Sequence, residues 1–233
     1  MPPDRTSMLG QLQQSARRRL TAAGIETPAL DARLIIQHAL GMTHEALIAS
    51  PDRLVDHQQS RHIDVLLARR ERREPVSRIT GEREFYGRPF LITPDVLDPR
   101  PDTETLIDQV VDIARTGFET ERPLRLLELG TGSGAIVVTL LAELVSASAT
   151  ATDVSDLALS VARHNAQQLV GLERIDFVET SWFDGICGEY DVIASNPPYI
   201  STKAITQLAP EVADYDPLLA LDGGRDGLGA YRA

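Results

Sequence analysis

The stretch that decides the fold is LRLLELGTGSG, residues 124–134. The apolar run Leu124–Leu129 predicts a buried strand, and the apolar stretch Ala135–Val145 has the length of a helix. Between them, glycines allow the backbone to approach a ligand closely, and the start of the helix offers N–H groups without partners. Strand, glycine turn and helix together predict the opening of a nucleotide-binding βαβ unit.

The spacing within this turn is G-x-G-x-G, formed by Gly130, Gly132 and Gly134. A dinucleotide site uses the wider G-x-G-x-x-G, so the shorter spacing disfavours an NAD-binding protein. Asp153 follows a second predicted strand, Ala147–Thr152, and lies 21 positions after Gly132. A carboxylate at this distance is placed to bind ribose hydroxyls. The alternative for the loop is a glycine turn without a ligand.

The sequence NPPY at residues 196–199 follows another apolar run, Tyr190–Ser195. Two prolines remove two backbone donors and stiffen the turn. An amide side chain on one side and an aromatic ring on the other suit a flat group that bears an NH₂, because oxygens accept its hydrogens and the ring stacks on its face. The alternative is a plain exit from a strand into a loop.

Strands that alternate with helices predict a parallel sheet in an α/β, Rossmann-like domain. Here the further helices are expected from about Asp102 to Phe118, with Thr103 and Glu104 near the start, and over Leu157–Leu169, with a strand at Ile175–Glu179. Ligands of such sheets bind at the carboxyl ends of the strands, so Gly130, Asp153 and Asn196 are expected to converge. The domains expected are a helical bundle over residues 1–75, a β-hairpin connector over 76–101 and the α/β domain over 102–233.

Charge and residue composition disfavour several classes of function. Residues 1–75 carry a net charge of +2 and the remainder −13, which gives −11 for the chain. The acidic half repels a phosphate backbone and disfavours nucleic acid as a substrate. One cysteine, Cys187, and no apolar run long enough to span a membrane indicate a soluble, cytoplasmic protein. The five histidines show no metal-ligand spacing with Cys187, so no metal is expected.

The chain resembles the release-factor glutamine N5-methyltransferases of the HemK/PrmC type. The resemblance covers most of the sequence and rests on residues 75–81, REFYG at 83–87, TPDVL at 93–97, PRPDTE at 99–104, the glycine loop, DVS at 153–155, NPPY at 196–199 and ALDGG at 220–224. NPPY alone is shared with DNA and RNA amino-group methyltransferases, whereas REFYG and PRPDTE are more particular to this family.

The resemblance implies an enzyme that uses S-adenosyl-L-methionine to methylate the side-chain amide of the glutamine in the Gly-Gly-Gln motif of class I peptide chain release factors. It implies that the cofactor is bound by Glu128, Gly130, Thr131, Gly132, Gly134, Asp153, Trp182 and Asn196. The substrate would be bound by Asn196, Pro197, Pro198 and Tyr199, with Asn196, Pro197 and Tyr199 as the catalytic residues. The helical bundle would bind the release factor, and the protein is expected to act as a monomer.

Arg100 and Glu104 are implied in the shell around the cofactor or substrate, or alternatively in an ion pair that ties the hairpin to the helix. The sequence departs from the family at Asp98, where an apolar residue is usual. It also departs at its end, because the resemblance stops at Tyr231-Arg232, where the family continues with a helix and three more strands. A C-terminally incomplete sheet of four strands is therefore expected. The alternative functions are methylation of amino groups on adenine or guanine in DNA or RNA, and an inactive fragment.

Overall fold

The computed structural model describes residues 7–117 and 122–233, which divide into two compact units, Met1–Thr80 and Gly81–Ala233. Each unit has its own hydrophobic core. The division falls five residues after the end expected for the helical bundle, because residues 76–80 form a short helix that packs with the first unit.

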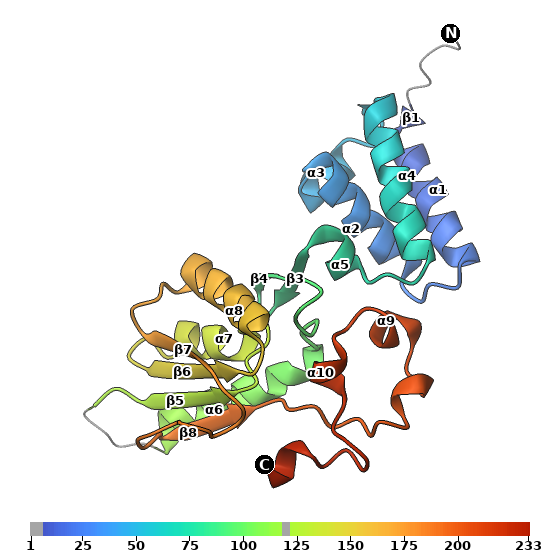
Figure 1. Cartoon of the computed structure of the whole chain (residues 1–233). Helices are drawn as coiled ribbons and strands as arrows, with labels where there is room; N and C mark the ends of the chain where they lie inside the picture. The colour runs from blue at the N-terminus through green and yellow to red at the C-terminus, as the bar shows by residue number, and fades with distance from the viewer. Residues whose placement is uncertain (1–6, 118–121) are drawn as a thin grey trace. The chain divides into compact units, whose positions relative to one another are not determined.

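The first unit is a bundle of helices (Figure 1). Its elements are β1 (Ser7–Met8), α1 (Leu9–Ala22), α2 (Pro28–Leu40), α3 (His44–Ala49), β2 (Leu54–Val55), α4 (His57–Glu71) and α5 (Val76–Thr80). Local signals in the sequence set the helix ends. A capping box between Asp56 and Gln59 begins α4, and Gly41, in the left-handed conformation with φ 59°, ends α2.

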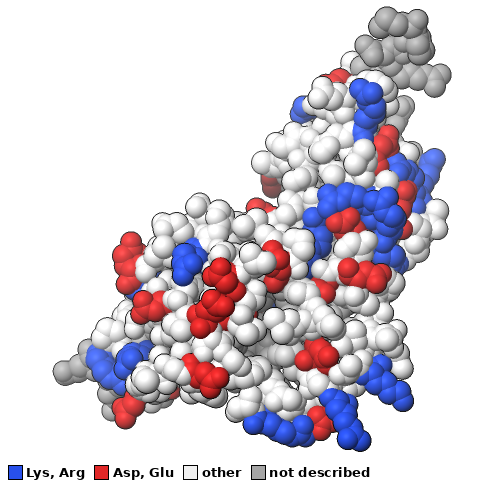
Figure 2. Space-filling model, in the orientation of Figure 1, with Lys and Arg blue, Asp and Glu red and all other residues white. Residues whose placement is uncertain are grey.

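Four arginines lie at the end of α4 and just beyond it: Arg69, Arg70, Arg72 and Arg73. Arg69 pairs with Glu74 at 2.6 Å, and Arg73 donates to the Gly24 carbonyl. Arg70 is buried and pairs with Asp31 at 2.7 Å, with side chains only 9% and 7% exposed. Figure 2 shows blue, basic side chains in patches on this unit, with red, acidic ones beside them.

The second unit holds the parallel sheet. It contains β3 (Glu82–Phe85), β4 (Arg88–Leu91), the 3₁₀ turn η1 (Pro101–Thr103), α6 (Glu104–Thr116), β5 (Arg125–Leu129), α7 (Ala135–Glu143), β6 (Ser148–Asp153), α8 (Asp156–Leu169), β7 (Ile175–Glu179), β8 (Val192–Ser195), η2 (Ile205–Gln207), α9 (Pro210–Ala213), α10 (Leu218–Leu221) and η3 (Ala230–Arg232). The predicted end of α6 at Phe118 lies outside the described residues.

Strands β5 to β8 pair in parallel in the order β7-β6-β5-β8. Chain order reverses beside β5, because β6 lies on one side of it and β8 on the other (Figure 1). Ligands of open α/β sheets bind at such a switch point, outside the carboxyl ends of the strands. The α/β prediction is confirmed, and the ends of β5, β6 and β8 lie where a ligand site is expected.

The hairpin β3–β4 turns through two residues, Tyr86 and Gly87, both with positive φ (51° and 71°). Positive φ at both central positions matches the strand twist of a tight hairpin, but it is unusual for tyrosine. Two contacts with α6 hold Tyr86 there: its N–H donates to the Glu104 carboxylate at 2.9 Å, and its hydroxyl donates to Asp108 at 2.8 Å. The hairpin is thereby tied to α6.

Candidate active site

A cavity of about 590 Å³ opens at the carboxyl ends of the strands. Most of its residues come from the loop between the hairpin and α6, the glycine turn after β5, the segments that follow β6 and β7, the NPPY segment after β8, and the segment around α10, and Gly229 and Ala230 add to it. Of the residues predicted for the site, the cavity is lined by Glu128, Gly130, Thr131, Gly132, Asp153, Trp182, Asn196, Pro197 and Pro198. The expected convergence of Gly130, Asp153 and Asn196 is therefore present.

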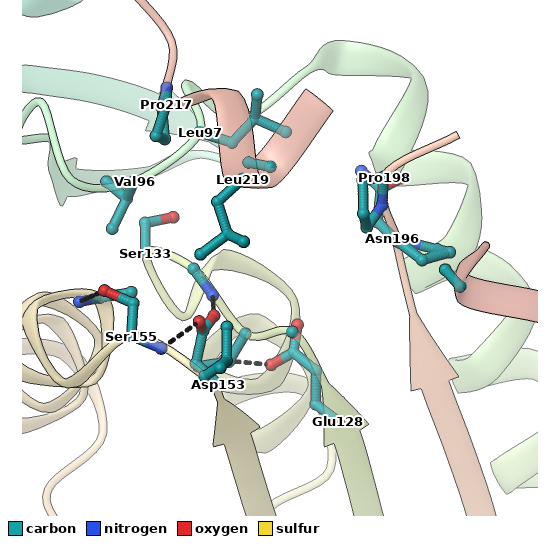
Figure 3. A pocket seen from close by; sticks show the side chains of 18 of the residues that line it. Val96, Leu97, Glu128, Ser133, Asp153, Ser155, Asn196, Pro198, Pro217 and Leu219 are labelled. Atoms are coloured by element: carbon teal, nitrogen blue, oxygen red, sulfur yellow. Dashed lines mark hydrogen bonds between the residues drawn. The ribbon is translucent and has the colours of Figure 1, made fainter. Parts of the chain in front are cut away.

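The glycine turn presents bare backbone to this cavity. Gly130 and Gly132 have φ of 70° and 55°, and a methyl group added to either would meet no atom within 4 Å. Asp153 fixes the turn, because its carboxylate accepts the Gly132 N–H at 2.9 Å and the Ser155 N–H at 3.0 Å (Figure 3). The open space beside the two glycines can be filled by a ligand that lies against the backbone.

Glu128 lies at the floor of the cavity and is 1% exposed. One carboxylate oxygen, Oε2, accepts the Thr131 hydroxyl at 2.5 Å and the Val137 N–H at 3.2 Å. The other, Oε1, is buried without a hydrogen-bond partner in the described part of the chain. Burial raises the pKa of Glu128 to about 8, against the opposing effect of the two hydrogen bonds. At neutral pH the carboxyl therefore keeps its proton, and because Oε2 already accepts two hydrogen bonds, Oε1 is the oxygen that carries the proton and is left to bond a polar ligand.

Asn196 and Pro198 lie across the cavity from Glu128 and Asp153 (Figure 3). The Asn196 Nδ2 donates to the Thr103 hydroxyl at 3.3 Å. Asn196 and Pro197 also line a second cavity, together with Tyr199 and Leu106. The two cavities therefore share a wall, and Asn196 belongs to it.

Two predicted residues lie elsewhere. Gly134 is not among the described residues that line either cavity. It has φ 79° at the start of α7, and an added methyl group would lie 3.1 Å from the Ala162 Cβ and 3.2 Å from its Cα. Gly134 therefore allows α7 to pack closely against α8. Tyr199 lines the second cavity and is 62% exposed, so in this structure its ring is accessible and does not cover the first.

Arg100 lines both cavities, and its guanidinium pairs with Asp216 at 2.5 Å. The Asp216 carboxylate is 1% exposed and also accepts the Asp98 N–H at 3.3 Å. Asp98 itself is buried and faces Arg83 at 3.8 Å, which supplies a counter-charge at a position where an apolar residue was expected. Glu104 binds the hairpin through the Tyr86 N–H, and that hydrogen bond, not an ion pair with Arg100, ties hairpin to helix.

Sequence reasoning missed the contributions of Thr103, Asp216 and the apolar residues Val96, Leu97, Pro217 and Leu219, which face the cavity in Figure 3 or border its polar residues. They come from loops and from short helical turns without periodic patterns. The available signal was the set of segments on which the family resemblance rests: TPDVL contains Val96 and Leu97, PRPDTE contains Thr103, and ALDGG directly follows Leu219.

Comparison with known proteins agrees with the fold. Residues 11–81 match the PrmC N-terminal domain and residues 104–213 match the Methyltransferase small domain. The solved structure of the hMettl16 catalytic domain with the MAT2A 3′UTR hairpin 6 aligns with a TM-score of 0.51 at 18% identity, over 78% of this chain and 63% of that one. That likeness shows the fold alone. The fold and the matched family models thus define a methyltransferase of the α/β class.

Full-length relatives give the family. The chain is 42% identical to a release factor glutamine methyltransferase of Agrobacterium fabrum, over 94% of this chain and 75% of that protein. It is 44% identical to one of Bradyrhizobium diazoefficiens, over 96% of this chain and 76% of that protein. The chain belongs to the PrmC/HemK release factor glutamine methyltransferase family, and it spans about three quarters of the length of these relatives.

Proposed function

We propose that this chain transfers a methyl group from S-adenosyl-L-methionine to the side-chain nitrogen of the glutamine in the Gly-Gly-Gln motif of class I release factors. The observation that carries the proposal is the identity of 42% to 44% with release factor glutamine methyltransferases over nearly the whole chain. The geometry supports it, because a cavity with a glycine turn on one side has an amide side chain and two prolines on the other.

The residues present fit the cofactor. Gly130 and Gly132 leave room against the backbone, and the Glu128 Oε1 is a buried polar atom whose hydrogen-bonding capacity a polar ligand can satisfy. We assign the binding of the cofactor to Glu128, Gly130, Thr131, Gly132, Asp153, Trp182 and Asn196, all of which line the cavity. When bound, S-adenosylmethionine supplies a methyl group that is electrophilic because its sulfur is positively charged.

The protein's own task is to orient a poor nucleophile. The lone pair of an amide nitrogen is delocalised into its carbonyl, so the nitrogen reacts only when it is well aligned. In this proposal the Asn196 Oδ1 accepts one N–H of the substrate amide and the Pro197 carbonyl accepts the other, while the exposed Tyr199 ring packs on the amide plane. Alignment of this kind lowers barriers by about 7 kcal/mol or more. Hydrogen bonds that strengthen in the transition state add to turnover.

No strong base is required in this scheme, since the nitrogen becomes acidic only after it has gained the methyl group. The helical unit, whose residues 11–81 match the PrmC N-terminal domain, is assigned to binding the release factor. We place the reaction in the cytoplasm, where release factors act, and assign it to a monomer. None of the helices described is both long and apolar enough to cross a membrane.

Mass spectrometry tests the proposal directly. The chain is incubated with S-adenosylmethionine and a purified class I release factor, and the factor is then digested and mapped. One added methyl group on the Gly-Gly-Gln glutamine is expected. A release factor with that glutamine changed to alanine is the matched control and should gain none. Methylation of both factors, or of neither, contradicts the proposal.

A further inference from the structure

Thr103 stands at the N-cap position of α6, directly before Glu104. A threonine at this position usually accepts a hydrogen bond from the helix's own N–H groups. Here the Thr103 side chain makes no capping hydrogen bond. The reason lies in the backbone: η1 runs straight into α6, so Thr103 already has helical angles, φ −68° and ψ −19°, where a capping residue would be extended.

The hydroxyl of Thr103 is used for a distant contact instead. It accepts a hydrogen bond from the Asn196 Nδ2 at 3.3 Å, across 93 positions of sequence. Both residues line both cavities. The Thr103 hydroxyl thus does not cap its own helix. It contacts Asn196, in the wall where we propose that the substrate amide binds.

In the orientation that the structure shows, this contact satisfies the NH₂ end of the Asn196 amide. An asparagine side chain has an NH₂ group that only donates and an oxygen that only accepts. With Nδ2 bound to the Thr103 hydroxyl, Oδ1, which lies in the same plane on the other side of the Cβ–Cγ bond, is left for another partner. A substrate NH₂ needs acceptors, so the reverse orientation, with the Asn196 NH₂ toward the substrate, would set donor against donor.

We infer that Thr103 is a positioning residue that holds the Asn196 side chain in the orientation in which its oxygen accepts from the substrate amide. The inference rests on the proposed function and adds to it a residue that never needs to contact the reacting atoms.

Three variants test this inference. T103V keeps the shape and removes the hydroxyl, T103S keeps the hydroxyl, and T105V alters an exposed threonine two residues further along α6. T103V should lower kcat about three- to tenfold, the effect of one neutral hydrogen bond, with the affinity for S-adenosylmethionine unchanged. T103S should restore kcat to within about twofold, and T105V should match the unmodified chain. An unchanged kcat in T103V overturns the inference.

The melting temperature and the double variant of Thr103 and Asn196 distinguish a positioning role of Thr103 from a purely structural one. Because no capping hydrogen bond is lost, T103V should melt at the same temperature as T105V. If both T103V and T103S melt at a lower temperature, and kcat falls in proportion to that loss of stability, the inference is overturned. Adding T103V to N196A should cause no further loss of kcat, since the two residues act as one unit. Additive losses contradict it.

The NMR resonances of the Asn196 side chain test the contact without relying on methyltransferase activity. The side-chain NH₂ resonances of Asn196, identified by their loss in N196A, should shift in T103V and stay in place in T105V. Resonances that stay in place in T103V overturn the inference even if the chain methylates release factors. If the resonances shift but the chain leaves the glutamine unmodified, the contact stands and the proposed function fails.

Discussion

At the scale of single residues, the amide of Asn196 is where the proposed reaction depends most on one side chain. N196A removes the acceptor for the substrate N–H but leaves the glycine turn, Glu128 and Asp153 in place. We expect kcat to fall by about 100-fold or more, as on removal of one preorganised hydrogen-bonding group from other active sites. The dissociation constant for S-adenosylmethionine, measured by calorimetry, should change far less. An equal loss in both quantities would assign Asn196 to cofactor binding alone.

The buried carboxyl of Glu128 predicts a dependence of stability on pH. Its pKa is raised from 4.5 to about 8 in the folded chain, so the unfolded chain releases this proton first as the pH rises. Stability is therefore lost between about pH 4.5 and 8, with a slope of at most about 1.4 kcal/mol per pH unit. E128Q cannot ionise and should lack this decline in urea unfolding at a series of pH values.

The exposed Glu173 provides the control for that measurement. E173Q should keep the dependence of the unmodified chain, because it leaves the buried carboxyl in place. Parallel curves for E128Q and the unmodified chain would show that Glu128 ionises in the folded state as it does in the unfolded one.

Residue identities at the strand ends could be predicted from sequence, since Gly130, Asp153 and Asn196 each follow an apolar run. The partners of these residues could not. Thr103 contacts Asn196 across 93 positions, and Asp216 pairs with Arg100 across 116. Such contacts are set by how loops fold over the sheet, which local periodicity does not record.

At the scale of elements, the packing of α7 on α8 depends on Gly134. G134A places a methyl group 3.2 Å from the Ala162 Cα and imposes φ 79° on an alanine. The left-handed backbone costs about 1–2 kcal/mol and the overpacking about 1–3 kcal/mol. We expect G134A to lower the free energy of unfolding by roughly 2–5 kcal/mol, measured in urea.

Gly185 is the matched control for this prediction. It has φ 71° and no atom within 4 Å of an added methyl group, so G185A imposes the backbone strain without the clash. G185A should therefore cost only about 1–2 kcal/mol. Equal losses in the two variants would mean that helix packing does not require a glycine at position 134.

Elements with strong periodicity were predicted closely, and β7 matches its predicted bounds, Ile175–Glu179. The start of α6 was less well predicted, because η1 precedes it and a threonine before glutamate is typical of an N-cap. The predicted hairpin region began at residue 76, whereas residues 76–80 form α5. Val76 and Ile79 pack on the core of the helical unit, and that tertiary contact outweighs the β-branched composition.

At the scale of the whole molecule, two separate cores predict that one unit can be destabilised on its own. D31A removes the carboxylate that pairs with the buried Arg70 in the helical unit. Breaking a buried ion pair from one side costs about 3–5 kcal/mol. Hydrogen exchange should show lost protection in α2 and α4 and unchanged protection in β5 and β6.

The control is the exposed pair between Arg19 and Asp64, in which the aspartate side chain is 61% exposed. D64A should cost less than about 1 kcal/mol. Loss of protection throughout the chain in D31A would show that the two units unfold as one.

The first peptide unit of α6 joins two contacts that were described separately. Thr103 accepts from Asn196, and the next residue, Glu104, accepts from the hairpin turn at Tyr86. Because the two residues are consecutive in the chain, a displacement of the start of α6 moves the partners of both contacts. The hairpin and the Asn196 amide are therefore linked through the start of this helix, and a shift of the hairpin tip that moves the helix start also reaches the proposed methylation site.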